Sequence, residues 1–120
     1  MKEFTLSAPL PSNKLGQNSR GHWSSKAGET AKYRALICLL AKKALVGDKP
    51  MWEKANVRLI AHFPTLAFPD PINFYDRMKA AFDGLQDAGL LKDDKNLWPN
   101  GGEFHKDAAN PRVVIVVTPE

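Results

Sequence analysis

The spacing of apolar residues constrains the fold of this 120-residue chain more than any other feature of its sequence. From residue 33 to residue 45 the spacing is typical of one face of a helix. The residues on this face are Tyr33, Leu36, Ile37, Leu40, Ala41, Ala44 and Leu45. From residue 57 to residue 63 apolar residues occupy alternate positions, which predicts a strand with one buried face.

A second helix is predicted to begin at Asp70. Asp70 suits the N-cap position, and Pro71 suits the first helical position because its missing N–H would have no partner there anyway. An apolar stripe at helical spacing follows, and Gly89 ends it. The stripe consists of Phe74, Met78, Ala81, Phe82 and Leu85.

Two further strands are predicted near the ends of the chain. Phe4 and Leu6 alternate with polar neighbours, as in a short strand. The run 113–117 is almost continuously apolar and fits a central strand covered on both faces, although its period also permits a short helix. The glycines of the segment 101–106 favour a hairpin.

These patterns predict an α+β fold, with two helices packed on a small mixed β-sheet in one domain spanning residues 1–120. The composition, with 43% hydrophobic and 25% charged residues, is typical of a globular protein. No apolar run approaches the roughly 20 residues that span a bilayer, so we expect no membrane partner and a cytoplasmic location. The single cysteine, Cys38, excludes an internal disulfide and a cysteine-rich zinc site.

Charge is distributed unevenly along the chain. Residues 2–58 contain 11 Lys or Arg against 4 Asp or Glu, whereas residues 70–96 contain 6 Asp against 4 Lys or Arg. This arrangement suits a polyanion that is bound by one region and cut, with the help of a metal, in another.

The acidic segment combines oxygen ligands with a lysine. Asp70 and Asn73 precede Lys79, and the doublet Asp93-Asp94 follows. Carboxylates bind Mg²⁺, and a nearby lysine can neutralise charge on a phosphate, which favours metal-assisted phosphodiester hydrolysis. Each of these carboxylates also has a structural alternative, since Asp70 can cap a helix and Asp93-Asp94 can form a turn. Asp83 and Asp87 are expected to lie in solvent.

The run from Lys79 to Asp94 resembles the conserved region of the RusA family of Holliday junction resolvases. Asp70 and Asn73 match the first aspartate and the asparagine of the preceding family motif, Lys79 matches its lysine, and Asp94 matches the catalytic aspartate of the doublet. The segments 9–13 and 18–23 also resemble the family's entry loop, particularly in phage and actinobacterial relatives.

The resemblance implies a homodimer that nicks a four-way DNA junction symmetrically with Mg²⁺. Asp70, Lys79 and Asp94 would be catalytic, and Asn73 would orient a ligand or a water molecule. The metal would be held by Asp70 and Asp94, with Asp93 or Asp76 as further ligands. The candidate DNA contacts are Arg20, His22, Trp23, Lys26, Lys32 and Arg34, for which a solvated helix face or a core tryptophan is the alternative.

One position departs from the family motif. Ile72 occupies the place of its middle aspartate and cannot ligate a metal. Asp76 could supply the missing carboxylate, or Asp70 and Asp94 could suffice with water. A protein that binds junctions with weak or no cleavage is the remaining nucleic-acid alternative, and an adaptor that binds no DNA is the other class of protein left open.

Overall fold

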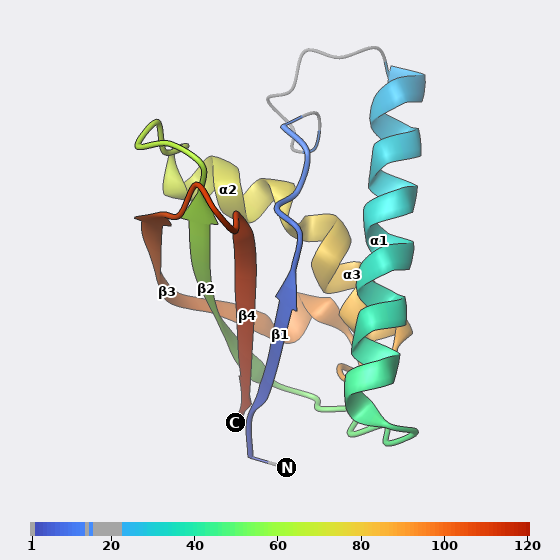
Figure 1. The fold of residues 1–120 in the computed structure, drawn as a ribbon. Coiled ribbons are helices and arrows are strands. Elements are labelled where there is room, and N and C mark those ends of the chain that lie inside the picture. Colours follow the sequence, from blue (N-terminus) through green and yellow to red (C-terminus); the bar gives the residue numbers. More distant parts are fainter. Residues whose placement is uncertain (1, 14, 16–22) are drawn as a thin grey trace.

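The computed structural model describes residues 2–13, 15 and 23–120 of the chain. Its helices are α1 (Trp23–Leu45), α2 (Pro71–Arg77) and α3 (Lys79–Asp87), and a short 3-10 helix, η1, spans Asp94–Asn96. Its strands are β1 (Phe4–Ala8), β2 (Ala55–Phe63), β3 (Leu97–Lys106) and β4 (Arg112–Pro119). They form one sheet in the order β1-β4-β2-β3, in which β2 and β3 are parallel and the other neighbours are antiparallel (Figure 1). The predicted α+β fold with a small mixed sheet is confirmed.

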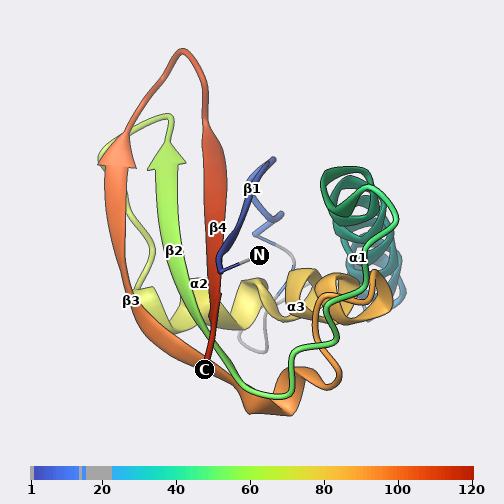
Figure 2. The same cartoon turned by 90° about the horizontal axis from the view of Figure 1, so that it is seen from below.

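The helices pack on one face of the sheet. α2 and α3 follow one another across it, and α1 lies against α3 and β1 (Figure 2). The rings of Phe74 on α2 and Phe63 on β2 are in edge-to-face contact, with their centres 5.5 Å apart. The core therefore lies between this face and the helices, and the opposite face of the sheet is an outer surface. Within the described part of the chain, no helix is both long and apolar enough to cross a bilayer.

The strand predicted from residue 113 to residue 117 is part of β4, which lies between β1 and β2 as expected of a central strand. Val113, Ile115 and Val117 are fully buried, whereas Val114 and Val116 are half-buried on the outer face. The expectation that this strand is covered on both faces is therefore wrong, because the helices in the described part of the chain pack on one face only.

The predicted start of the second helix is confirmed. The Asp70 carboxylate accepts hydrogen bonds from the backbone N–H groups of Ile72, at 2.8 Å, and Asn73, at 3.4 Å. Pro71 occupies the first turn. The helix does not run without a break to Gly89, because Met78 separates α2 from α3 with a backbone close to that of a turn (φ −83°, ψ −1°).

The segment predicted as a glycine hairpin is instead the C-terminal part of β3, which pairs in parallel with β2. The pairing shifts between Val57 and Leu59, where two residues of β3, Asn100 and Gly101, lie between the paired Pro99 and Gly102 and form an irregularity in the strand. Gly101 has a φ of 75°, and a Cβ on Gly102 would lie 2.6 Å from the carbonyl oxygen of Leu59. Glycine is thus required here by the close approach of two strands rather than by a turn.

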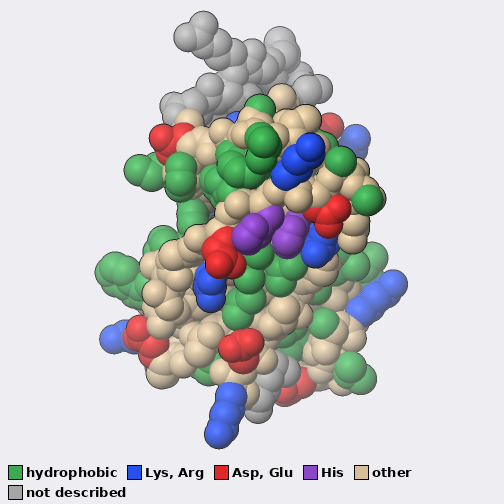
Figure 3. Space-filling view, turned by 60° about the vertical axis from the view of Figure 1, so that its left-hand side comes forward, with side chains coloured by type: hydrophobic (Ala, Val, Ile, Leu, Met, Phe, Trp, Pro, Cys, Tyr) green, Lys and Arg blue, Asp and Glu red, His purple; other side chains and the backbone are tan. Residues whose placement is uncertain are grey.

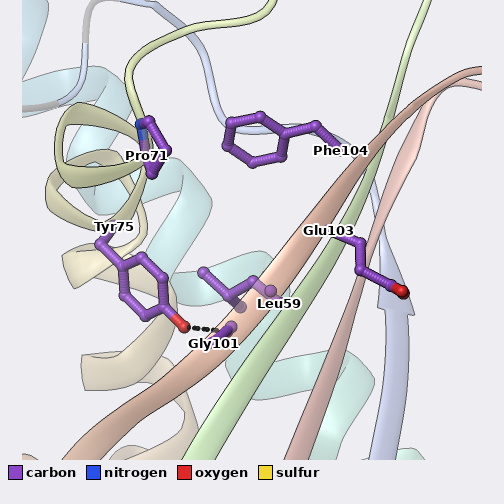
Figure 4. Close-up of a pocket in the computed structure, with 7 residues that line it drawn as sticks. Leu59, Pro71, Tyr75, Gly101, Glu103 and Phe104 are labelled. Atoms are coloured by element: carbon purple, nitrogen blue, oxygen red, sulfur yellow. Dashed lines mark hydrogen bonds between the residues drawn. The ribbon is translucent and has the colours of Figure 1, made fainter.

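Tyr75 ties α2 to this irregularity. Its hydroxyl donates a hydrogen bond to the carbonyl oxygen of Gly101 at 2.7 Å (Figure 4). Burial raises the pKa of this phenol above its ordinary value. A mostly apolar cavity of about 220 Å³ lies beside the ring, between Pro71 of α2 and Phe104 of β3.

The contact between α1 and α3 depends on Gly84. A Cβ at this position would lie 2.6 Å from the carbonyl oxygen of Arg34 and 3.1 Å from the Cβ of Ile37. Only a residue without a side chain allows the two helix backbones to approach this closely. The sequence of α3 thereby sets the distance between the helices.

An ion pair joins the same two helices at the surface. Arg34 of α1 donates to both carboxylate oxygens of Asp87 on α3, at 2.6 and 2.9 Å. These hydrogen bonds lower the pKa of Asp87 and raise that of Arg34. Asp87 is exposed, as expected, and its ion pair with Arg34 therefore lies at the surface.

We predict that Gly84→Ala lowers the free energy of unfolding by about 1–3 kcal/mol, since the added methyl group forces α1 and α3 apart. Gly28→Ala on α1 is the matched control, because a Cβ there meets no atom within 4 Å. The control should instead stabilise the protein by roughly 0.5–1 kcal/mol. Urea unfolding of the wild type and both variants measures the difference, and a Gly84→Ala protein as stable as the control would refute the assigned contact.

We predict that Asp87→Asn costs less than about 1 kcal/mol at neutral pH, because both side chains of the ion pair are partly exposed. The pKa of Asp87 is depressed in the folded state. The stability from this pair is therefore fully present above the ordinary carboxyl pKa of 3.8 and is lost as the pH falls below it. Urea unfolding at pH 7 and pH 3 should show the wild type and Asp87→Asn converging at the lower pH. A difference that persists at pH 3 would contradict this assignment.

Candidate active site

Lys79 lies between two carboxylates. Its ammonium group is 3.1 Å from Oδ1 of Asp83 and also contacts Oδ2 of Asp94. Asp83 follows Lys79 by one helical turn on α3, so helical geometry alone brings these two together. Asp94 comes from η1, and its arrival beside Lys79 depends on the path of the chain after α3.

Backbone hydrogen bonds hold Asp94 in place. Its N–H donates to Oε1 of Gln86 at 3.1 Å, which connects the turn to α3. Asp93 caps η1 by accepting a hydrogen bond from the N–H of Lys95 at 3.0 Å, so the predicted turn role of the doublet is confirmed. The Asp94 side chain is 12% exposed and that of Asp93 is 41% exposed, so the two members of the doublet differ clearly in burial.

The pKa values of the two carboxyl groups of this cluster are shifted in opposite directions. Burial and a hydrogen bond with Asp94 raise the pKa of Asp83. Burial would also raise the pKa of Asp94, but hydrogen bonds from Asp83 and Lys79 lower it below its ordinary value. The pKa of Lys79 is raised, because hydrogen bonds to Asp94 and Asp83 outweigh the opposing effect of burial. The cluster therefore holds a charged lysine beside two carboxyl groups that interact with each other.

A cleft of about 170 Å³ opens beside this cluster. Lys26 of α1, Asp76 of α2 and Asp83 of α3 contribute to its walls, together with Lys79 and Arg77. Three of the predicted site residues, Lys26, Asp76 and Lys79, thus meet in one cleft. The mixture of cationic and anionic side chains suits a phosphate that is accompanied by a cation.

Asp70 lies at the opposite end of α2 from Lys79, and its carboxylate caps that helix. The capping role is confirmed, and Oδ1 of the carboxylate accepts both capping hydrogen bonds. Asn73 is half-buried on the first turn of α2, and Ile72 beside it is 81% exposed. The apolar residue at the position of the family's middle aspartate therefore faces solvent rather than a core.

The predicted DNA contacts are spread over several environments. Arg20 and His22 lie outside the described residues, and Trp23 begins α1 without a described side chain. Lys32 is exposed and lines a separate cleft of about 280 Å³. Arg34 is held by its ion pair with Asp87.

Asp83 is the residue that sequence reasoning missed. It had been expected to lie in solvent, but its side chain is only 25% exposed and contacts Lys79. The spacing of Lys79 and Asp83, four residues apart on a predicted helix, was the available signal. The helical contact of Asp83 could therefore have been predicted, whereas its proximity to Asp94 could not.

No three His, Cys, Asp or Glu side chains among the described residues are already arranged around a metal position. Mg²⁺ does not require such a set, because it usually keeps several waters and binds one or two carboxylates together with substrate phosphates. Asp83 and Asp94, which interact beside an open cleft, fit that requirement. Asp76 lies in the wall of the same cleft.

Comparisons with known proteins add little to this picture. No family model matches the chain. It is 29% identical over 86 residues to an uncharacterized protein of Xylella fastidiosa strain Temecula1; the match covers 70% of this chain and 56% of that protein, so the chain spans about half of its relative. A crystal structure of hydrogenase maturation protein HypE, and another of HypE in complex with ATP, match 97% of this chain and 30% and 28% of those chains. Both matches have 10% identity, and their TM-scores of 0.35 and 0.33 are too low to support an argument about fold or function.

Proposed function

We propose that this chain is a Mg²⁺-dependent, structure-specific endodeoxyribonuclease that resolves four-way DNA junctions by symmetric nicking. The observation that carries the proposal is the placement of Lys79 between Asp83 and Asp94 beside a cleft that also contains Lys26. The resemblance of the run 79–94 to RusA resolvases supports the same reaction. Such an enzyme would act in DNA recombination and repair in the cytoplasm.

Each group of the cluster has a task in phosphodiester hydrolysis. Asp83 and Asp94 would hold Mg²⁺, which supplies an activated water and polarises the phosphate. Lys79 would turn from the carboxylates toward the phosphate and neutralise the charge that develops on it. Its side chain is 61% exposed, which leaves it free to make this movement.

The remaining acidic residues would support this arrangement. Asp83 supplies a carboxylate that compensates for Ile72, a role for which Asp76 is the other candidate in the same cleft. Asp70 caps the far end of α2, so the length of that helix separates it from the metal proposed at Asp83 and Asp94. Asn73 would orient a water molecule. Asp93 would fix the position of Asp94 by capping η1.

Binding of the junction would use the basic part of the chain. Lys26 is the predicted DNA contact closest to the chemistry, because it shares a cleft with Lys79. Arg20, His22, Trp23, Lys32 and Arg34 remain proposed contacts. A homodimer would present two such sites to the two-fold symmetric junction, so that opposite strands are cut in the same way.

A junction-binding protein without cleavage is the second candidate, and Ile72 is the observation that favours it. Loss of one carboxylate weakens metal binding more than it weakens contacts with the DNA backbone. Binding that persists in the presence of a chelator, without nicked product, would identify this alternative. An adaptor without nucleic-acid affinity would show no salt-dependent binding at all.

We predict that Asp94→Asn and Asp83→Asn each reduce cleavage of a labelled four-way junction in Mg²⁺ by at least about a hundredfold, the usual scale for one group that stabilises charge in a transition state. Asp48→Asn, an exposed residue after α1, is the matched control and should cleave like the wild type. Linear duplex and chelator complete the comparison. Wild-type binding without nicks would reject the enzyme, and cleavage that survives Asp83→Asn would reject the role of that carboxylate.

We predict that Lys79→Ala also lowers cleavage by about a hundredfold while junction binding changes much less. In the metal-free protein the same substitution should raise the pKa of Asp94, because Lys79 contributes to holding it low. Carboxyl NMR titration measures this effect independently of activity. Unchanged cleavage by Lys79→Ala would remove the lysine from the mechanism, and an unchanged Asp94 titration would contradict the contact itself.

A further inference from the structure

Two histidines lie side by side on the outer face of the sheet, on the side away from the helices. His62 of β2 and His105 of β3 are directly paired in the parallel register. Their ring centres are 5.3 Å apart and their planes differ by 24°. Figure 3 shows the two imidazoles together at the surface, with acidic and basic side chains on either side.

A carboxylate adjoins this pair. Glu103 precedes His105 by two residues on β3, so both side chains project from the same face of the strand. Oε2 of Glu103 lies 3.7 Å from Nε2 of His105. Arg58, on the neighbouring strand, contacts the same oxygen at 3.2 Å and holds the carboxylate in place.

We propose that His62, His105 and Glu103 form a binding site for a divalent transition-metal cation, with Zn²⁺ as the best fit. Two imidazoles and one carboxylate are a ligand set that suits Zn²⁺ and leaves a coordination position for water. Neither the proposed nuclease function nor the Asp83–Asp94 pair is needed for this site. Mg²⁺ would not compete well for it, because Mg²⁺ prefers oxygen ligands.

The distances match those that a shared metal requires. A Zn–N bond of about 2 Å places the centre of each imidazole roughly 3 Å from the metal, so tetrahedral ligands have ring centres about 5 Å apart. The observed separation is 5.3 Å. The 3.7 Å between Glu103 and His105 is close to the edge of the same tetrahedron, which is roughly 3.4 Å for bonds of this length.

Binding requires rotation of the rings, without movement of the strands. The imidazoles are nearly parallel, and these three groups do not yet converge on one point in the described part of the chain. His105 is about half exposed, and terminal imidazole torsions are broad and easily changed. The rigid part of the site is the pairing of β2 and β3, which sets the distance between the two histidines.

The surrounding charges permit a cation to bind. Arg112 and Asp107 face His62, and these two form an ion pair of 3.0 Å. Glu103 and His105 are the other titratable groups around His62, and Arg58 is paired with Glu103.

The test is isothermal titration of the full, tag-free chain with Zn²⁺ at pH 7.5. His62→Gln and His105→Gln should each weaken binding at least about tenfold, since even the loss of a supporting partner of a ligand has an effect of that size. Glu103→Gln should weaken it by a smaller factor. The third histidine of the chain provides the matched control, and His22→Gln should bind Zn²⁺ like the wild type.

A second measurement reports on the ligands directly. Imidazole nitrogen NMR of the wild type should show that Zn²⁺ shifts the ring resonances of both His62 and His105. Binding should weaken at pH 5.5, where protons compete for the imidazoles. Equal affinity of the wild type and both histidine variants, no Zn²⁺ binding at millimolar concentration, or a shift confined to His22 would each overturn the proposal. Junction cleavage assays in Mg²⁺ test the nuclease function separately, so the two proposals can fail independently.

Discussion

The close approach of α1 and α3 at Gly84 is the constraint on which the proposed site depends. Because no side chain separates the backbones, α1 lies near enough to α3 for Lys26 to share a cleft with Lys79 and Asp83. The Arg34–Asp87 ion pair lies on the same contact and adds little energy. The packing of α1 against α3 therefore determines which basic and acidic side chains lie close together at the surface.

The chemistry of the cluster arises from a balance between like and opposite charges. Asp83 and Asp94 would repel one another if both were ionised, and Lys79 relieves that repulsion. A divalent cation could replace the lysine at this place with twice the charge. The same arrangement thus explains why the carboxylates can remain close without a metal and why they would gain from one.

The local features of the fold could be predicted from the sequence, because they depend on near neighbours. The start of α2 at Asp70-Pro71 and the strand within residues 57–63 are examples. β3 was missed because Gly102 allows its strand to pass close to the backbone of Leu59, and these two residues are far apart in the sequence. For the same reason the cluster was only half predictable: Lys79 and Asp83 follow from helical spacing, whereas the position of Asp94 beside them depends on the tertiary path after α3.

The irregularity in β3 also bears on how the protein behaves in a crowded solution. β3 is at one edge of the sheet, so one side of its backbone has no neighbouring strand among the residues that the structure describes. Regular exposed edges of this kind are templates on which other chains can add strands and aggregate. Pro99 lacks a backbone donor, and the shift at Gly101 breaks the regular row of free N–H and C=O groups. The bend that the glycines allow therefore makes this edge a poor template for intermolecular β-pairing.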